Sequence, residues 1–240
     1  MSLCAATSTN ADDWRQFRGA SGLGTDTSTD HFPDTLEDAS HVAWKIAVPP
    51  GHSSPIIVGD SIVLTGHEPG HFVIQCFDRA DGSLEWKREI PVAQLEKVYH
   101  HGPATPTPVS DGENVYCLFG SFGIIAVSLD GKELWRKELT VAENMYGTAA
   151  SPVLADNHLV LLLSDQKHAS LMALDKSTGR EVWNRKAEGP ASSWSTPAFW
   201  PASSLQVALI YEPFHLRGIS LKSSRCCDAM TSLTVVLQPC

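Results

Sequence analysis

Residues 173–183 read ALDKSTGREVW: a short apolar run, a polar turn and a tryptophan. Two weaker copies precede it, CFDRADGSLEW and AVSLDGKELW. In every copy a glycine stands four residues before the tryptophan. The pattern predicts a repeated unit in which glycine forms a tight turn and tryptophan packs on an adjoining sheet. The predicted structural positions are Gly82, Trp86, Gly131, Trp135, Gly179 and Trp183.

A second marker recurs in step with the tryptophans. Ser-Pro or Thr-Pro pairs open an apolar run after each tryptophan, beginning with Trp44. The pairs are Ser54-Pro55, Thr107-Pro108, Ser151-Pro152 and Thr196-Pro197. Both markers return after about 45 residues, which is the size of a β-propeller blade. We expect proline at the first residue of a strand, where the ladder needs no donor.

Within each unit the apolar runs predict short strands rather than helices. SPIIVGDSIVLTG, at residues 54–66, contains two such runs around a Gly-Asp turn, and related hairpin signals follow in the next two units. A third run and the tryptophan strand complete four strands per unit. The sequence therefore predicts an all-β protein, a β-propeller of four-stranded antiparallel blades, with about three complete blades and a partial fourth.

The repeat also resembles a known family. AxDxxTGxxxW is matched in full in residues 173–183 and is similar to the pyrroloquinoline-quinone (PQQ) repeat. That repeat builds the propellers of quinoprotein alcohol dehydrogenases and of proteins that bind no quinone, including the outer-membrane assembly lipoprotein. Residues 12–24, 51–66 and 100–127 look like PQQ-like repeat proteins common in planctomycetes. The resemblance implies a PQQ-like β-propeller and says little about activity.

The resemblance also suggests how the chain is divided. Residues 12–223 correspond to propeller blades, while residues 1–11 read as a leader, either the remnant of a signal peptide or a short disordered segment. The tail lacks the glycine and tryptophan that the repeat would place there. It comprises residues 224–240, SRCCDAMTSLTVVLQPC. We expect this tail to be aberrant, in keeping with a truncated or frame-shifted propeller fragment. The resemblance implies a periplasmic or extracellular bacterial protein.

Composition excludes some partners. The formal net charge of −9 offers no basic stripe for nucleic acid. No run of about 18 apolar residues predicts a membrane-spanning helix. Six cysteines do not form the regular pattern of a disulfide framework. Cys76 and Cys117 stand in apolar runs and are predicted to be core residues.

Histidines and aromatic residues mark one candidate binding region. The loops that lead into successive blades converge on a propeller's central axis, so their side chains line its central face. Under this hypothesis a polar pocket is lined by His52, His100, His101, Tyr146 and Trp194. The alternative is that the histidines are loop residues bonded to backbone or water. Neither interpretation predicts a metal site. His100 and His101 are adjacent, and adjacent residues of a strand point to opposite faces, so in a strand the two could not readily share a metal ion.

Catalytic motifs are not evident. GHSSP is not the nucleophile motif G-x-S-x-G, and no phosphate-binding loop is present, so no catalytic residue is predicted. Quinoprotein dehydrogenases hold PQQ against two adjacent oxidised cysteines, with calcium as a second cofactor. Cys226 and Cys227 are adjacent but lie in the segment that departs from the repeat.

Two functions follow from these observations. The favoured hypothesis is a non-catalytic binding or scaffold module for a protein, peptide or glycan, with no assigned cofactor. The alternative is part of a PQQ- and calcium-dependent quinoprotein dehydrogenase that oxidises alcohols or sugars.

Overall fold

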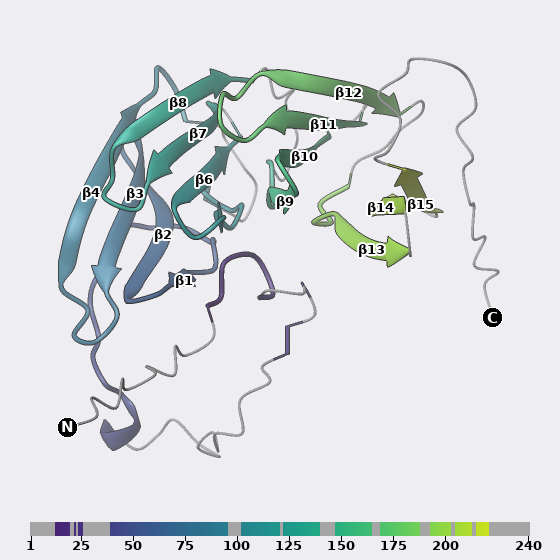
Figure 1. The fold of residues 1–240 in the computed structure, drawn as a ribbon. Coiled ribbons are helices and arrows are strands. Elements are labelled where there is room, and N and C mark those ends of the chain that lie inside the picture. Colours follow the sequence, from purple (N-terminus) through teal and green to yellow (C-terminus); the bar gives the residue numbers. More distant parts are fainter. Residues whose placement is uncertain are drawn as a thin grey trace, which may run out of the picture.

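The structure is a computed structural model, and it describes a large part of the chain. The described residues are 13–19, 22, 24, 25, 39–95, 102–120, 122–139, 147–164, 169–187, 193–202, 205–212 and 215–220. Within these ranges the chain forms four sheets in sequence order (Figure 1). The predicted leader and the tail from residue 224 lie outside the described residues.

Every sheet is built from short consecutive strands. A 3-10 helix, η1 (Ala39–His41), precedes them. The first sheet contains β1 (Ile56–Val58), β2 (Ser61–Glu68), β3 (His71–Asp78) and β4 (Leu84–Pro91). The second contains β5 (Val109–Ser110), β6 (Asn114–Phe119), β7 (Gly123–Ser128) and β8 (Glu133–Glu138). The third contains β9 (Val153–Ala155), β10 (His158–Ser164), β11 (Ala169–Asp175) and β12 (Glu181–Ala187). The fourth contains β13 (Ala198–Ala202), β14 (Leu205–Glu212) and β15 (His215–Ser220).

The sheets have the topology of propeller blades. Strands pair antiparallel in chain order, so β1, β5, β9 and β13 each form one edge of a sheet. β1 approaches β5 and β5 approaches β9 across neighbouring sheets, so these edges are the inner ones. Figure 1 shows the four sheets following one another along an arc from β4 to β15. The predicted all-β propeller architecture is confirmed, and the fourth blade has three strands in the described part.

The predicted turns also form. The hairpin between β1 and β2 turns at Gly59, whose φ is +58°, a left-handed conformation that favours glycine. The Ser-Pro and Thr-Pro pairs differ slightly from the prediction, because each proline stands one residue before its strand rather than in it. The missing N–H of proline is therefore outside the ladder altogether.

The hydrophobic core lies between neighbouring blades. Phe72 of β3 and Phe119 of β6 are fully buried, and their rings stack with centroids 4.4 Å apart. A second cluster joins blades two and three and includes Tyr116 and Leu159. Each blade face thus buries apolar surface only by stacking on the next blade, as expected for a repeat protein. The core assignment of Cys76 and Cys117 is confirmed, since both are buried and form no disulfide.

The tryptophans join one blade to the next at the outer rim. Trp86 of the first blade lies on the turn glycine of the second, where a Cβ on Gly131 would stand 2.8 Å from the ring. Trp135 lies in the same way on Gly179, at 2.5 Å. The φ angles of Gly131 and Gly179 are +81° and +69°. Two independent requirements, left-handed backbone and no side chain, therefore select glycine here.

Each of these contacts, which we call the outer joints, also contains a hydrogen bond. Trp86 Nε1 donates to the carbonyl oxygen of Leu129 at 2.8 Å. Trp135 Nε1 donates to the carbonyl oxygen of Lys176 at 2.9 Å. The indole thus buries its ring while its single polar group finds a backbone partner in the next blade.

A β-bulge sets the orientation of each tryptophan. The register shifts between Cys76 and Phe77, and at the equivalent places in β7 and β11. Beyond each shift the tryptophan stands opposite a small residue, as Trp86 does opposite Cys76 and Trp183 opposite Ala173. Bulges re-aim side chains, and here they place the indole against the adjoining blade.

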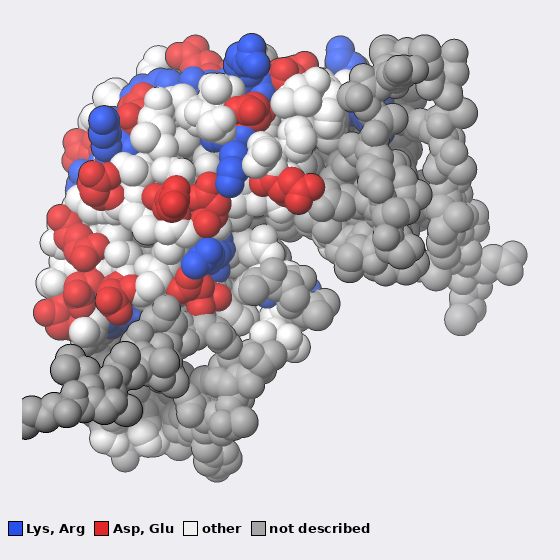
Figure 2. Space-filling model, in the orientation of Figure 1, with Lys and Arg blue, Asp and Glu red and all other residues white. Residues whose placement is uncertain are grey.

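The surface carries charges of both signs. Figure 2 shows acidic and basic side chains interspersed over the described part of one face. Several form ion pairs. Arg88 of β4 pairs with Glu133 of β8 at 2.7 Å, across two blades, and Lys87 of β4 pairs with Glu68 at the end of β2 at 2.8 Å. In the part of the chain that the structure covers, no helix has the length and apolar character needed to cross a membrane.

Candidate functional site

The candidate site lies in the segments that lead into the inner strands, which we call the opening loops. They comprise residues 51–55, 102–108, 147–152 and 193–197. Of the predicted site residues, His52 is in the first loop and Trp194 in the fourth. His100, His101 and Tyr146 lie outside the described residues. His52 and Trp194 therefore share one end of the blades and belong to the opening loops of the first and fourth blades.

His52 fastens the first opening loop to the second. Its Nδ1 accepts a hydrogen bond from the N–H of Gly102 at 3.0 Å. Its own backbone N–H donates to the carbonyl oxygen of Ala104 at 3.0 Å. Because Nδ1 accepts, the proton of the neutral ring lies on Nε2. These contacts are of the kind that the alternative interpretation, a loop histidine bonded to backbone, describes.

A second histidine, which was not predicted from the sequence, lies near His52. His67, near the end of β2, lies so close to Gly102 that a Cβ there would be 2.9 Å from its Nε2. Burial lowers the pKa of His67, and the nearby charge of His52 lowers it further. The two histidines are 15 positions apart, and they meet because the antiparallel β2 returns to the end where β1 began. The hairpin signal could have indicated this pairing.

A chain of hydroxyl groups links the opening loops of all four blades. The N–H of Ser54 donates to Thr107 Oγ1 at 3.0 Å, and the N–H of Thr107 donates to Ser151 Oγ at 3.0 Å. The N–H of Ser151 then donates to Thr196 Oγ1 at 3.1 Å. We call this the hydroxyl chain. Its members are the serines and threonines of the Ser-Pro and Thr-Pro repeat, so this marker encodes contacts between blades.

Trp194 is the exposed aromatic residue of the fourth opening loop. Its side chain is 40% exposed. The loop around it is held by Ser164 of β10, whose Oγ donates to the carbonyl oxygen of Ser193 at 2.6 Å and lies 3.2 Å from its N–H. Ser193 and Ser195 also approach each other through their hydroxyls at 3.0 Å. An exposed indole on a fixed loop is typical of residues that anchor protein contacts.

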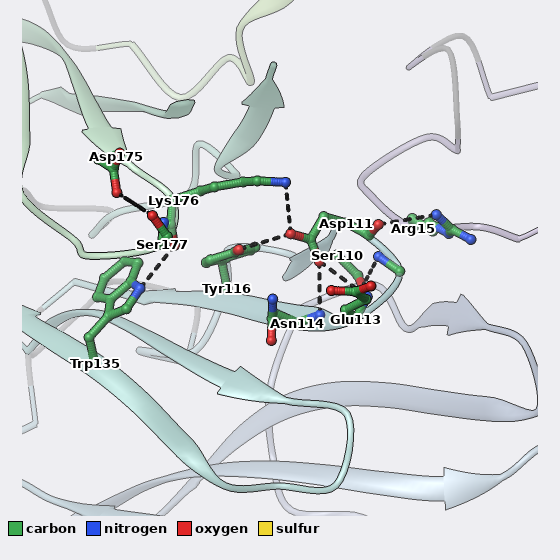
Figure 3. A network of polar contacts seen from close by, with 11 residues as sticks. Arg15, Ser110, Asp111, Glu113, Asn114, Tyr116, Trp135, Asp175, Lys176 and Ser177 are labelled. Atoms are coloured by element: carbon green, nitrogen blue, oxygen red, sulfur yellow. Dashed lines mark hydrogen bonds and ion pairs between the residues drawn. The ribbon is translucent and has the colours of Figure 1, made fainter. Parts of the chain in front are cut away.

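The opposite end of the blades carries a polar network around Asp111 (Figure 3). Asp111 Oδ2 accepts hydrogen bonds from Lys176 Nζ of the third blade at 2.9 Å and from the Tyr116 hydroxyl at 3.1 Å. Oδ1 accepts from the N–H groups of Glu113 and Asn114. Burial raises the pKa of Asp111, but these hydrogen bonds, with Lys176 foremost, lower it overall. The carboxylate is thus saturated and serves as a contact between blades.

The N-terminal segment adds to this network. Trp14 forms an antiparallel bridge with Ile57 on the inner edge of β1. The N–H of Ser110 donates to the carbonyl oxygen of Arg15 at 2.8 Å, and Arg15 Nη1 donates to that of Asp111 at 3.3 Å. The segment therefore fastens to the first two blades at the end away from the opening loops.

The dehydrogenase alternative would need adjacent cysteines against the quinone and oxygen ligands for calcium. Cys226 and Cys227 lie outside the described residues. Cys76 and Cys117 stand in different strands, and burial raises the pKa of the Cys76 thiol to about 12. Across the ranges that the structure describes, no three side chains of histidine, cysteine, aspartate or glutamate gather in a way that could hold a metal ion.

These features define a class of protein: a β-propeller of PQQ-like repeats, with blades joined by tryptophan on a glycine turn. The chain belongs to the family described as "Outer membrane protein assembly factor BamB", whose model matches residues 70–225. The outer membrane protein assembly factor BamB of Kangiella koreensis is 25% identical over 136 residues. This match covers 56% of the chain and 32% of that protein, so the chain spans about a third of the relative's length.

Solved structures share the architecture. The quinohemoprotein alcohol dehydrogenase from Comamonas testosteroni matches with a TM-score of 0.62 and 11% identity, over 89% of this chain and 40% of that one. A europium-containing methanol dehydrogenase matches with a TM-score of 0.56 and 15% identity, over 71% of this chain and 36% of that one. At such identities the similarity establishes the fold and leaves the activity open.

Proposed function

We propose that the chain is a non-catalytic binding module whose opening loops contact a protein partner. Its membership of a family described as an assembly factor supports a protein as the partner class. The observation that carries the proposal is the arrangement of the opening loops. The hydroxyl chain and His52 bind these loops to one another, so Trp194 is presented from a preorganised surface.

Preorganisation matters because binding must offset the entropy lost when loops become ordered. Loops that already bond to one another lose less freedom when a partner binds. An exposed indole then contributes a large contact area with only two rotatable bonds. This combination suits recognition of a folded or extended polypeptide better than turnover of a small substrate.

The test compares two exposed aromatic residues. Trp194 is 40% exposed and Phe17, in the N-terminal segment, is 37% exposed. The full chain and the variants Trp194→Ala and Phe17→Ala are used to capture proteins from the periplasmic extract of the native host, and the bound proteins are identified by mass spectrometry. We expect Trp194→Ala to lose a specific partner about tenfold or more, and Phe17→Ala to retain it. Equal retention by both variants would contradict the proposal.

A parallel measurement addresses the dehydrogenase alternative. The chain is incubated with PQQ and calcium, and reduction of an artificial electron acceptor is followed with alcohols and sugars. Calcium-dependent acceptor reduction would overturn the non-catalytic assignment. A panel of immobilised glycans tests for a carbohydrate ligand. Specific binding of the chain to one glycan would show that the ligand is a carbohydrate and would contradict a protein partner.

We also propose a periplasmic or extracellular location in a bacterium. The outer-membrane description of the relative supports this location. Fractionation of the native host, with a cytoplasmic enzyme as marker, tests it. Recovery of the protein with the cytoplasmic marker would contradict it.

A further inference from the structure

A glycine lies between two histidine rings at the place where the first two opening loops meet. A Cβ on Gly102 would stand 2.9 Å from His67 Nε2 and 3.4 Å from His52 Nδ1. Gly102 is not among the residues with positive φ. The close approach of the two rings, rather than a left-handed backbone, therefore disfavours a side chain at this position.

One hydrogen bond at this contact depends on the charge of a ring, whereas its neighbours do not. The N–H of Gly102 donates to His52 Nδ1 at 3.0 Å. The backbone N–H of His52 donates to the carbonyl oxygen of Ala104 at 3.0 Å. The backbone N–H of His67 donates to the carbonyl oxygen of Pro50 at 2.8 Å. Only the bond to Nδ1 requires an unprotonated imidazole nitrogen.

Protonation of His52 would remove this acceptor. Both nitrogens of an imidazolium ion are donors, so Nδ1 and the N–H of Gly102 would face each other as two donors. Turning the ring over puts a carbon atom in the place of Nδ1 and does not restore an acceptor. An imidazole changes its charge between about pH 5 and pH 8, which makes this bond sensitive to mild acid.

His67 brings a second charge to the same place. Burial lowers the pKa of His67, and the charge of His52 lowers it further. Because the folded pKa lies below the ordinary value of 6.5, the folded chain takes up fewer protons than the unfolded chain at mildly acidic pH. The closed arrangement therefore loses stability as the pH falls below about 6.5, and it is unaffected above that value, where the ring is neutral in both states.

Charged groups of both blades lie on the strand ends around the two rings. They are Glu68, His71, Lys87 and Glu89 of the first blade, and Arg136, Lys137 and Glu138 of the second. Lys87 pairs with Glu68 at 2.8 Å and with Glu89 at 2.9 Å. The charge that acts on His67 is that of His52. A carboxylate would stabilise a protonated ring, whereas a second ring opposes it, so acid weakens this contact.

We propose that the two histidines and Gly102 form an acid-sensitive contact, which we call the histidine latch, between the first two opening loops. The latch is closed while His52 Nδ1 accepts from Gly102, and protonation of the rings releases it. The hydroxyl chain has no ionisable group, so the bond from Ser54 to Thr107 Oγ1 persists. Release therefore loosens residues 102–104 while the blades stay joined. Control of partner binding by this loosening rests on the function proposed above, whereas the latch itself is tested without a partner.

The first test follows the latch by NMR in the full chain between about pH 7.5 and pH 5.5, a range in which exposed carboxylates stay charged. We expect ring nitrogen shifts that show His52 Nδ1 to be unprotonated at the higher pH. The amide proton of Gly102 should move upfield on acidification with the same midpoint as the His52 ring. A Gly102 resonance that does not follow the ring overturns the proposal, and this result needs no variant.

His52→Asn is the matched variant for this titration. The side-chain oxygen of asparagine can stand where Nδ1 stands, and it accepts a hydrogen bond at every pH of the titration. We expect this variant to keep the Gly102 amide proton in place on acidification. The control His158→Asn, which removes a histidine of β10 in the third blade, should titrate as the parent chain does. An acid response of His52→Asn as large as that of the parent contradicts the latch.

The second test measures hydrogen exchange by NMR, with each rate referred to the intrinsic rate at that pH. We expect the protection of the His52 amide, which donates to Ala104, to fall about fivefold on acidification, while that of the Ser54 amide changes less than about twofold. His67→Gln removes the second charge and should reduce the loss at His52. Equal losses at His52 and Ser54 would indicate general unfolding and overturn the proposal. A loss in His67→Gln as large as in the parent would contradict the part assigned to His67.

Discussion

The blades are joined at two radii, and the two kinds of joint use different chemistry. At the outer rim, a tryptophan ring covers a bare glycine and donates one hydrogen bond, as Trp135 does on Gly179. At the inner end, the hydroxyl chain passes from loop to loop through hydrogen bonds such as that from Ser54 to Thr107. The outer joints bury apolar area, whereas the inner joints satisfy backbone donors close to the central axis.

This difference follows from geometry. Blades diverge toward the rim, so a large flat side chain is needed to span the wider gap there. Near the axis they converge, and only short side chains such as serine and threonine fit between backbones. We therefore expect outer changes to cost more stability than inner ones, and inner changes to act mainly on the order of the opening loops.

The largest effect is expected at a turn glycine of an outer joint. Gly179→Ala places a Cβ 2.5 Å from the Trp135 ring and also strains a backbone with φ +69°. Gly70→Ala is the matched control, because its φ is +80° but no atom lies within 4 Å of the added Cβ. We expect Gly179→Ala to lower the free energy of unfolding by about 3 kcal/mol and Gly70→Ala to lower it by about 1 kcal/mol. Urea denaturation measures both values. Equal losses would show that the ring contact is unimportant.

The next effect concerns the tryptophan itself. Trp135→Phe removes the hydrogen bond to Lys176 and leaves unfilled volume, so we expect about 2 kcal/mol of destabilisation. Leu134→Ala, a neighbouring side chain that is 46% exposed, should cost less than about 1 kcal/mol. Thermal and urea unfolding of both variants measure the difference. A Leu134 variant as unstable as the Trp135 variant would refute the ranking.

A smaller effect is expected in the hydroxyl chain. Thr107 is 2% exposed, and Thr107→Val keeps its shape but leaves the N–H of Ser54 without its acceptor. We expect a loss of about 1–2 kcal/mol and faster hydrogen exchange at the Ser54 amide. Thr105→Val, whose hydroxyl bonds to Gly102 within its own loop, should leave that amide protected. Unchanged exchange at Ser54 in the Thr107 variant would contradict the role of the chain.

The smallest effect involves the charges beside the outer joints. The hydrogen bond from Arg136 lowers the pKa of Glu133 to about 2, with a further contribution from Arg88 of the first blade. Because the folded pKa lies below the ordinary value of 4.5, this stabilisation is present above about pH 4.5 and is lost as the pH falls toward 2. Glu133→Gln should cost about 1 kcal/mol at pH 7. Its difference from the parent chain should vanish near pH 2.

A double-mutant cycle apportions that charge effect. Combining Glu133→Gln with Arg88→Met isolates the pair that crosses between blades, and we expect a coupling of about 0.5 kcal/mol. A coupling that does not diminish at low pH would contradict the assigned ionisation.

Much of the fold was predictable because its determinants are local. Alternating apolar runs, turn glycines and the period of about 45 residues specify strands and blades without knowledge of distant contacts. The candidate site was less predictable. His52 stands in a loop, as its place before the first apolar run indicated, but His67 was missed because only the return of β2 brings it to Gly102.

The sequence by itself therefore determined the repeat, the blade and the residues that recur in it. The tertiary structure alone decided which partners those residues meet. Trp135 contacts the glycine of the following unit rather than its own, and Thr107 accepts from the preceding unit. Such pairings depend on the angle and spacing between packed sheets, which arise when neighbouring blades bury their apolar faces against each other and which no single repeat encodes.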